Sequence, residues 1–126
     1  MIAMIRYLFR HPKFPLLVKS DFRVFGAYNP KKIEMMIAKG AFNNDTLYQI
    51  IDSNGEGWSL YMKTAVISPL CMEKRWNKPK IIKFFNHSLE KAGLPQRFVG
   101  RSLSSKRLER VILEIIEFED ALEDQA

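Results

Sequence analysis

The stretch "DTLYQIIDSNGEGWSLYM", residues 45–62, decides the expected fold. Two runs of branched and aromatic residues, which are typical of strands, flank the dipeptide Asn54-Gly55. Asn-Gly accepts the positive φ angles that a tight hairpin turn requires. The stretch therefore predicts an antiparallel β-hairpin, around which the rest of a small sheet can be placed.

Strand signals continue on both sides of this hairpin. Residues 15–25, "PLLVKSDFRVF", place branched and aromatic residues around a Ser20-Asp21 turn. Residues 63–70, "KTAVISPL", either lengthen the second run or form another short strand, and Pro69 places that end at a sheet edge. Residues 1–15 fit both a helical face and a strand alternation, so two structures stay open for them.

Three helices are expected because the same start signal occurs three times. Each has a good N-cap residue, and an apolar residue just before the cap can contact another one four positions after it. The N-cap residues are Asn29, Asn77 and Ser104. Gly40 and Gly93 mark the ends of the first two helices, and the third is a long helix over residues 104–124.

The expected fold is α+β, with elements in the order β(β)-α-β-β-α-α. An antiparallel sheet of three to four strands would carry about three helices packed on one face. The 126 residues fit a single domain, residues 1–126. Cys71 is the only cysteine, which fits a reducing compartment, and no apolar run approaches the roughly 18 residues that a membrane span needs. We therefore expect a cytoplasmic protein without a transmembrane segment.

The charges are strongly segregated along the chain. The net charge is +6 and the pI is about 9.6. Residues 73–110 contain 11 Lys/Arg and 3 Asp/Glu (11 − 3 = +8), whereas residues 111–126 contain six Asp/Glu and no Lys/Arg (−6). A basic region of this kind favours an anionic partner, and an acidic end favours a basic one.

The residues that usually carry catalysis or bind metals form no complete motif. Asp52, Asn54 and Glu56 imitate the first ligands of an EF-hand, but Lys63 stands where the bidentate Glu is needed. The only soft metal ligands are Cys71, His11 and His87. Three scattered residues do not make a structural zinc site. We predict no catalytic residue, no metal and no cofactor; the pattern favours a non-enzymatic protein, and catalysis by a group that the fold assembles stays open.

A basic segment interleaved with aromatic residues supports nucleic-acid binding as an alternative function. Cations can hold a phosphate backbone while aromatic rings stack on bases. In residues 73–83, together with residues 97–110, the candidate residues are Lys74, Arg75, Trp76, Lys78, Lys80 and Lys83. The structural alternative is an ordinary solvated lysine face, in which Trp76 serves only as the apolar contact before the N-cap.

The helix over residues 104–124 carries the leading hypothesis, which is protein binding. Its apolar residues cover an arc of roughly 160°, more than one core-facing stripe needs, and its basic start and acidic end both oppose the helix dipole. The proposed contact residues are Leu113, Glu114, Ile116, Glu117 and Asp120. Such a module fits an inhibitor, immunity or adaptor-type protein, and head-to-tail self-association also follows.

Two structural explanations compete with a protein partner for this helix. The helix can be thoroughly buried in a small core, which would absorb the whole apolar arc. Its acidic end can also pair with the basic residues 73–101 of the same chain. Enclosed isoleucines and paired carboxylates would therefore argue against an outside partner.

Overall fold

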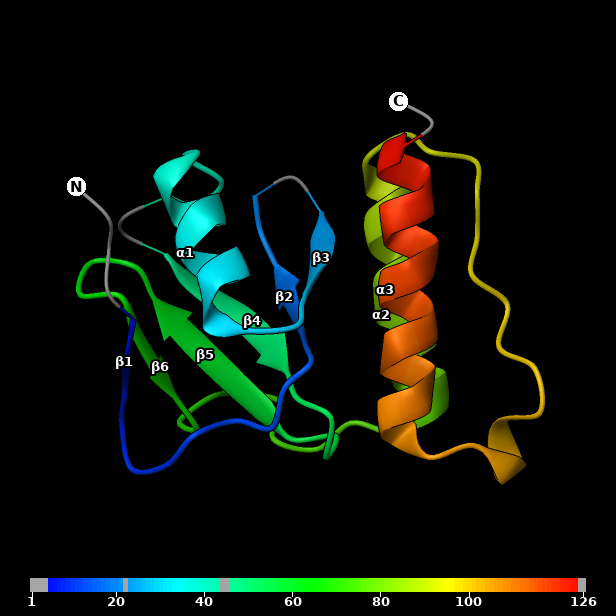
Figure 1. The fold of residues 1–126 in the computed structure, drawn as a ribbon, viewed down its shortest axis with the longest axis horizontal. Helices are drawn as coiled ribbons and strands as arrows, with labels where there is room; N and C mark the ends of the chain where they lie inside the picture. Colours follow the sequence, from blue (N-terminus) through cyan, green and yellow to red (C-terminus); the bar gives the residue numbers. More distant parts are fainter. Residues whose placement is uncertain (1–4, 22, 44–45, 125–126) are drawn as a thin grey trace.

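A computed structural model of the chain describes residues 5–21, 23–43 and 46–124. It is an α+β fold built on one six-stranded sheet (Figure 1). The strands are β1 (Arg6–Tyr7), β2 (Leu16–Lys19), β3 (Val24–Ala27), β4 (Leu47–Ile51), β5 (Gly57–Tyr61) and β6 (Val66–Ser68). The helices are α1 (Pro30–Ala38), α2 (Lys78–Lys91), the 3-10 turn Leu103–Ser105 and α3 (Leu108–Asp124). None of the helices described is long and apolar enough to cross a bilayer.

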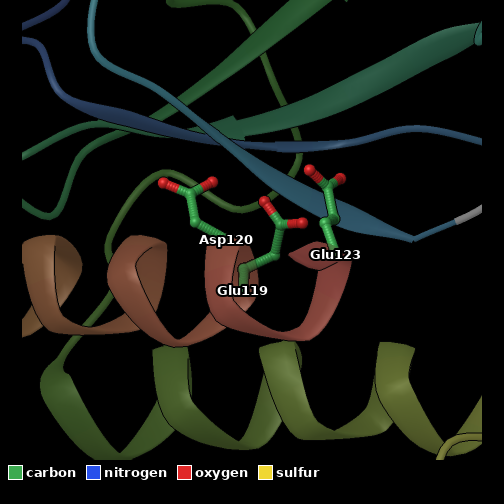
Figure 2. Close-up of side chains that lie close together, drawn as sticks. All are labelled: Glu119, Asp120 and Glu123. Carbon is green, nitrogen blue, oxygen red and sulfur yellow. The ribbon is translucent and has the colours of Figure 1, made fainter. Parts of the chain in front are cut away.

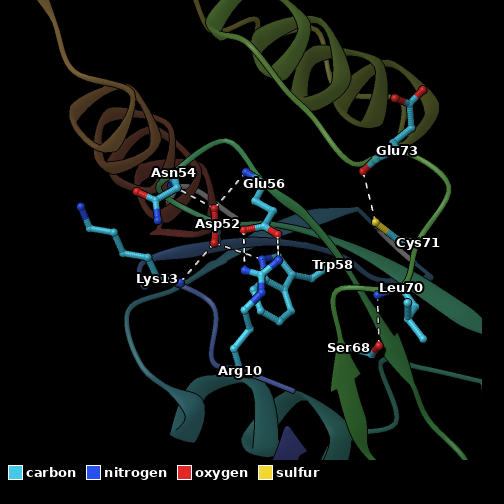
Figure 3. Close-up of polar contacts among 10 residues, drawn as sticks. All are labelled: Arg10, Lys13, Asp52, Asn54, Glu56, Trp58, Ser68, Leu70, Cys71 and Glu73. Atoms are coloured by element: carbon cyan, nitrogen blue, oxygen red, sulfur yellow. Dashed lines mark hydrogen bonds and ion pairs between the residues drawn. The ribbon is translucent and has the colours of Figure 1, made fainter. Parts of the chain in front are cut away.

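The predicted hairpin is confirmed, because β4 and β5 pair antiparallel and Gly55 at their turn has a φ of +76°. Asp52 holds the turn from inside. Its carboxylate is buried and accepts the backbone N–H groups of Asn54 and Glu56 at 2.9 Å each, and the indole N–H of Trp58 at 3.0 Å (Figure 3). The residues that imitate an EF-hand therefore form a hairpin turn, in which N–H donors of the protein already occupy the carboxylate oxygens of Asp52.

The sheet is larger than the three to four strands predicted, and it is mixed. Its order is β1-β6-β5-β4-β2-β3, and only β1 and β6 run parallel. The prediction left residues 1–15 and residues 63–70 undecided. The two-residue strand β1 forms in the first stretch, and β6 forms as a separate strand in the second. Pro69 follows the end of β6, but β6 is not an edge strand, because β1 lies beside it. In residues 1–15, for which both a helix and a strand were open, residues 6–7 form a strand, whereas residues 1–4 lie outside the described residues.

Helices lie on both faces of the sheet, so the prediction of one covered face is wrong. Leu16 and Val18 face the core cluster that contains Ile33 of α1, whereas Leu17 between them faces the cluster beneath α2 and α3. Figure 1 shows α1 over the middle of the sheet and α2 and α3 side by side at the β3 end. Strand β2 is therefore buried on both faces, which explains why its apolar residues form a continuous run.

The first two helix starts are confirmed. The side chains of Asn29 and Asn77 accept N–H groups three residues on, at 3.4 and 2.9 Å. The predicted cap Ser104 is wrong, because Ser102 has a φ of +53° and the chain makes a 3-10 turn before α3 begins at Leu108. Lys106 and Arg107 therefore precede the helix, so less positive charge opposes its dipole than the sequence predicted.

Candidate nucleic-acid interface

The apolar face of α3 is enclosed by the protein itself. Val111, Ile112, Ile115 and Ile116 are each 0% exposed, between the sheet and α2. Gly26 lets α3 pack closely against β3, because a Cβ at this position would lie only 2.2 Å from Ile116 Cγ1. The wide apolar arc is thus accounted for by two neighbours within the chain. Ile116 therefore has no exposed surface in the described structure, and its proposed contact with another protein stays a prediction.

Carboxylates of α3 find cationic partners on the same molecule. Glu114 accepts from Lys106 at 3.0 Å and from Arg110 at 3.1 Å, and the hydrogen bond from Lys106 is the main cause that lowers the pKa of Glu114. Glu119 and Glu123 lie 3.3 and 3.7 Å from the Arg23 guanidinium. These cations lie outside residues 73–101. These three side chains of α3 therefore do not make the expected contacts with that basic region.

Two of the proposed contact residues on α3 keep at least part of the exposed surface that a protein partner would need. Leu113 is half-buried and Glu117 is exposed, whereas Asp120 is half-buried and Glu114 is engaged as described. No apolar group of the set is fully open to solvent. Their role in protein binding stays a prediction.

Glu119 is a buried carboxyl with a structural partner at the edge of the sheet. One of its oxygens accepts the N–H of Gly26 at 3.4 Å, which occupies a backbone donor on the outer side of edge strand β3. Figure 2 shows its carboxyl close to those of Asp120 and Glu123. Burial, and then Glu123, raise the pKa of Glu119 to about 8, so the carboxyl is largely protonated at neutral pH. The cluster therefore closes the sheet edge.

The outer surface of α2 forms a groove with a cavity of about 560 Å³, which we call the α2 groove. Its aromatic and amide residues are Trp76, Phe84 and Asn86, and its cations are Lys80, Lys83 and Arg97. The rings of Trp76 and Phe84 meet edge to face at 4.9 Å. His87 and Glu90 complete the lining, so one carboxylate stands among three permanent cations.

Residues 94–103, which we call the strap, run back along α2 after the helix ends (Figure 1). Asn86 holds the strap by accepting the N–H of Phe98 at 2.8 Å and donating to its carbonyl at 2.9 Å. The Lys78 ammonium donates to the carbonyl of Leu103, which fixes the other end. The strap therefore brings Arg97 and Arg101 to the same side of the molecule as α2.

Most cations of this surface lack a carboxylate partner. Among the residues that the structure describes, no ion pair within 4 Å involves Lys74, Arg75, Lys83, Lys91, Arg97 or Arg101. All six are exposed. Lys80 is the exception, at 2.6 Å from Glu73, and its ammonium also lies 4.9 Å from the Trp76 ring centroid. The positive charge predicted for residues 73–101 is therefore largely uncompensated.

The structure thus brings together part of the predicted anion site. Lys74, Arg75 and Lys83 are exposed and unpaired, Trp76 is half-buried at the groove, Lys80 is paired, and Lys78 serves the strap. Arg97 belongs to the groove, as the inclusion of residues 97–110 anticipated. Whether these residues bind nucleic acid stays a prediction.

The structure has a second concave surface that was not predicted from the sequence. On the face of β4 and β5 that α2 and α3 leave open, a cavity of about 430 Å³ is lined by apolar residues, and we call it the sheet groove. Its apolar residues include Leu47, Leu70, Met72 and Trp76. Met72 is 99% exposed and Leu47 and Leu70 are 63% exposed. The one available signal was the apolar pair around Cys71 directly after β6.

The lone thiol does not form a nucleophilic pair. Cys71 Sγ is half-buried and donates to the carbonyl of Glu73 at 3.3 Å (Figure 3), and burial raises the pKa of this thiol. His11 stacks on Tyr7 at 4.3 Å and His87 lines the α2 groove. A thiol with a raised pKa is a poor nucleophile at neutral pH.

Comparison with known proteins adds no family assignment. The chain matches no protein-family model, no curated protein and no solved structure at a significant level. Inferences about function therefore depend on the geometry and charge described above.

Proposed function

We propose that this protein binds nucleic acid through the α2 groove and the strap. The observation that carries the proposal is the set of exposed cations without carboxylate partners, which stands beside an acidic helix whose Glu114 and Glu123 are paired with other cations. Unpaired cations on one surface release counterions when they contact phosphates, and this release supplies most of the non-specific affinity for nucleic acid. The rings of Trp76 and Phe84 add faces on which bases can stack.

Protein binding, in an inhibitor, immunity or adaptor-type role, is the second proposal. The exposed Leu70 and Met72 favour it, because apolar side chains grouped on a surface often mark a contact with another molecule. The enclosed face of α3 removes its original warrant, so we rank it below nucleic-acid binding. The lone, unpaired Cys71 suits a cytoplasmic setting for either function.

The salt dependence of binding tests the leading proposal. Fluorescence anisotropy with a labelled 15-nucleotide single strand would be measured from 50 to 300 mM NaCl for wild type and for the double variant Lys83→Ala/Arg101→Ala. Each lost phosphate contact lowers the slope of log K against log [salt] by about 0.7, so the double variant should lose about 1.4. Lys31→Ala/Lys39→Ala, at exposed positions in and after α1, is the control of equal charge.

Two results would contradict the proposal in different ways. Binding that does not weaken with salt would remove nucleic-acid binding altogether. An equal loss of slope in the two double variants would leave a non-specific basic protein and dismiss the α2 groove as the site.

A further inference from the structure

Trp76 is a wall shared by both concave surfaces of the molecule. It lines the α2 groove with Phe84 and Lys83, and it lines the sheet groove with Leu70 and Met72. Its indole N–H donates to the Glu73 carbonyl at 3.3 Å, which fixes the ring beside the Lys80–Glu73 ion pair. A chain-like ligand on α2 can therefore reach the sheet groove by passing one side chain.

The sheet groove suits a flat, largely uncharged group. Its exposed walls are Leu47, Leu70 and Met72. The exposed amide of Gln49 lines the cavity and makes no hydrogen bond within the described structure, so it can donate to and accept from the edge of a base. The one carboxylate that lines this cavity, Glu73, is already paired with Lys80 of the α2 groove at 2.6 Å.

A duplex fits this surface poorly. The major groove is about 12 Å wide and admits a helix about 10–12 Å in diameter, provided that one face of the helix projects beyond its neighbours. Helix α2 has α3 on one side and the strap on another, and Gly100 of the strap approaches Ile82 so closely that a Cβ would lie 2.7 Å from its Cδ1. The strap therefore narrows the face that α2 could present to a major groove, whereas a single strand can lie along that face.

We infer that the ligand is a single-stranded nucleic acid whose phosphates contact the α2 groove while unpaired bases pass Trp76 and insert between Leu47, Leu70 and Met72 in the sheet groove. This inference rests on the proposed function. It adds a base-binding site on the sheet that the electrostatic argument alone does not require. The bases are the occupant that charge complementarity favours, because the cations of the α2 groove, which shares Trp76 with the sheet groove, would hold the phosphates next to them.

A comparison of matched oligomers tests the inference. Oligothymidylate of 15 nucleotides and an abasic oligomer of the same length carry the same phosphates, but only the first carries bases. We expect wild type to bind oligothymidylate about tenfold more tightly, since each stacked base contributes measurably to affinity. Leu47→Gln should remove most of that difference while leaving the salt slope unchanged. Met35→Gln, at an exposed position of α1 away from both grooves, is the matched control.

Tryptophan fluorescence gives an independent readout. Trp58 is 1% exposed and serves as an internal reference, whereas Trp76 stands at both grooves. Oligothymidylate should quench the emission of Trp76, and inorganic polyphosphate, which offers charge without bases, should not. Trp76→Leu should abolish the quenching and keep a salt-dependent affinity for polyphosphate.

The outcomes separate this inference from the proposed function. Equal affinity for the abasic oligomer and oligothymidylate would overturn the base site and leave phosphate binding intact. No salt-dependent binding of either oligomer would overturn both. A Leu47-dependent dimer in sedimentation, with no effect of Leu47→Gln on oligomer binding, would assign the sheet groove to a second copy of the chain and dismiss the bases.

Discussion

Helices α2 and α3 lie side by side under the same face of the sheet, yet they handle charge in opposite ways. Glu114 and Glu123 of α3 are paired with cations of the same chain, and the core-facing residues Val111, Ile112, Ile115 and Ile116 are fully enclosed. The cations on α2 and the strap, Lys83, Lys91 and Arg101 among them, face solvent without carboxylate partners. In the sequence both helices are amphipathic and highly charged.

The difference shows that a run of like charge indicates a binding surface only when the fold leaves it uncompensated. The acidic end of α3 looked unusual because its charges oppose the helix dipole. That conflict is small, at about 0.3–1 kcal/mol per exposed charge, and contacts with Arg23 offset it. The basic face of α2 is less unusual in sequence, but within the described structure most of its cations, Lys80 excepted, have no carboxylate partner.

The largest expected effect comes from the enclosed face of α3. Ile116→Ala should lower the free energy of unfolding by about 3 kcal/mol, because it leaves a cavity over Gly26 in a face that is closed to solvent. Urea denaturation followed by circular dichroism would measure the loss. Leu113→Ala, at a half-buried position of the same helix, should cost about 1 kcal/mol or less.

A reversal of that ranking would contradict the assignment of α3 to the core. Should Ile116→Ala be nearly neutral for stability, the helix would be free to turn its apolar face outward, and a protein partner would again be its best explanation.

The second effect concerns the sheet edge, where a pH dependence follows from Glu119. Folding raises the pKa of this carboxyl from 4.5 to about 8, so the folded state holds a proton that the unfolded state releases between those values. Stability from this group is therefore complete below about pH 4.5 and falls as pH rises to about 8. Glu119→Gln, which stays neutral, should remove this decline.

Comparing the stability of wild type and Glu119→Gln across pH separates the effect of Glu119 from the effects of other titrating groups. Glu56 and Glu114 have lowered pKa values and contribute in the opposite direction at acidic pH, but they are present in both proteins. Thermal unfolding at pH 5 and pH 8 should therefore show wild type losing stability relative to Glu119→Gln. Relative to Glu119→Gln, Glu119→Ala should cost about 2 kcal/mol at both values, because the N–H of Gly26 loses its partner. Parallel pH profiles for wild type and Glu119→Gln would exclude a shifted carboxyl.

Much of the fold could be predicted where a local signal acts alone. Asn54-Gly55 identified the hairpin, and Asn29 and Asn77 identified two helix starts, because turn and cap chemistry depends on a few neighbouring residues. Ser104 gave the same signal and failed, since the 3-10 turn at Leu103–Ser105 satisfies its backbone differently. The doubly covered sheet was readable in the continuous apolar run Leu16–Val18, but that run was interpreted only as a strand.

The site was less predictable, because it depends on what the helices do not cover. The cations of residues 73–101 were identified, but their availability depends on where the carboxylates of α3 find partners. The sheet groove has no sequence signature beyond the apolar pair around Cys71. It exists because α2 and α3 cover the β2–β3 end of one face and leave Leu47 of β4 exposed.

The smallest effect on stability should mark the most important functional position. Lys83 is exposed and unpaired, so Lys83→Ala should change the free energy of unfolding by less than about 0.5 kcal/mol while weakening binding to oligothymidylate at 50 mM salt. Arg110→Ala on α3 is its counterpart, since it removes one of two cations from Glu114. Arg110→Ala should also lower the free energy of unfolding by about 0.5 kcal/mol or less, because exposed ion pairs contribute little. It should not weaken binding to oligothymidylate as Lys83→Ala does. Should the two variants weaken binding equally, the contrast between α2 and α3 would lose its functional meaning, and the whole basic surface would act as one diffuse field.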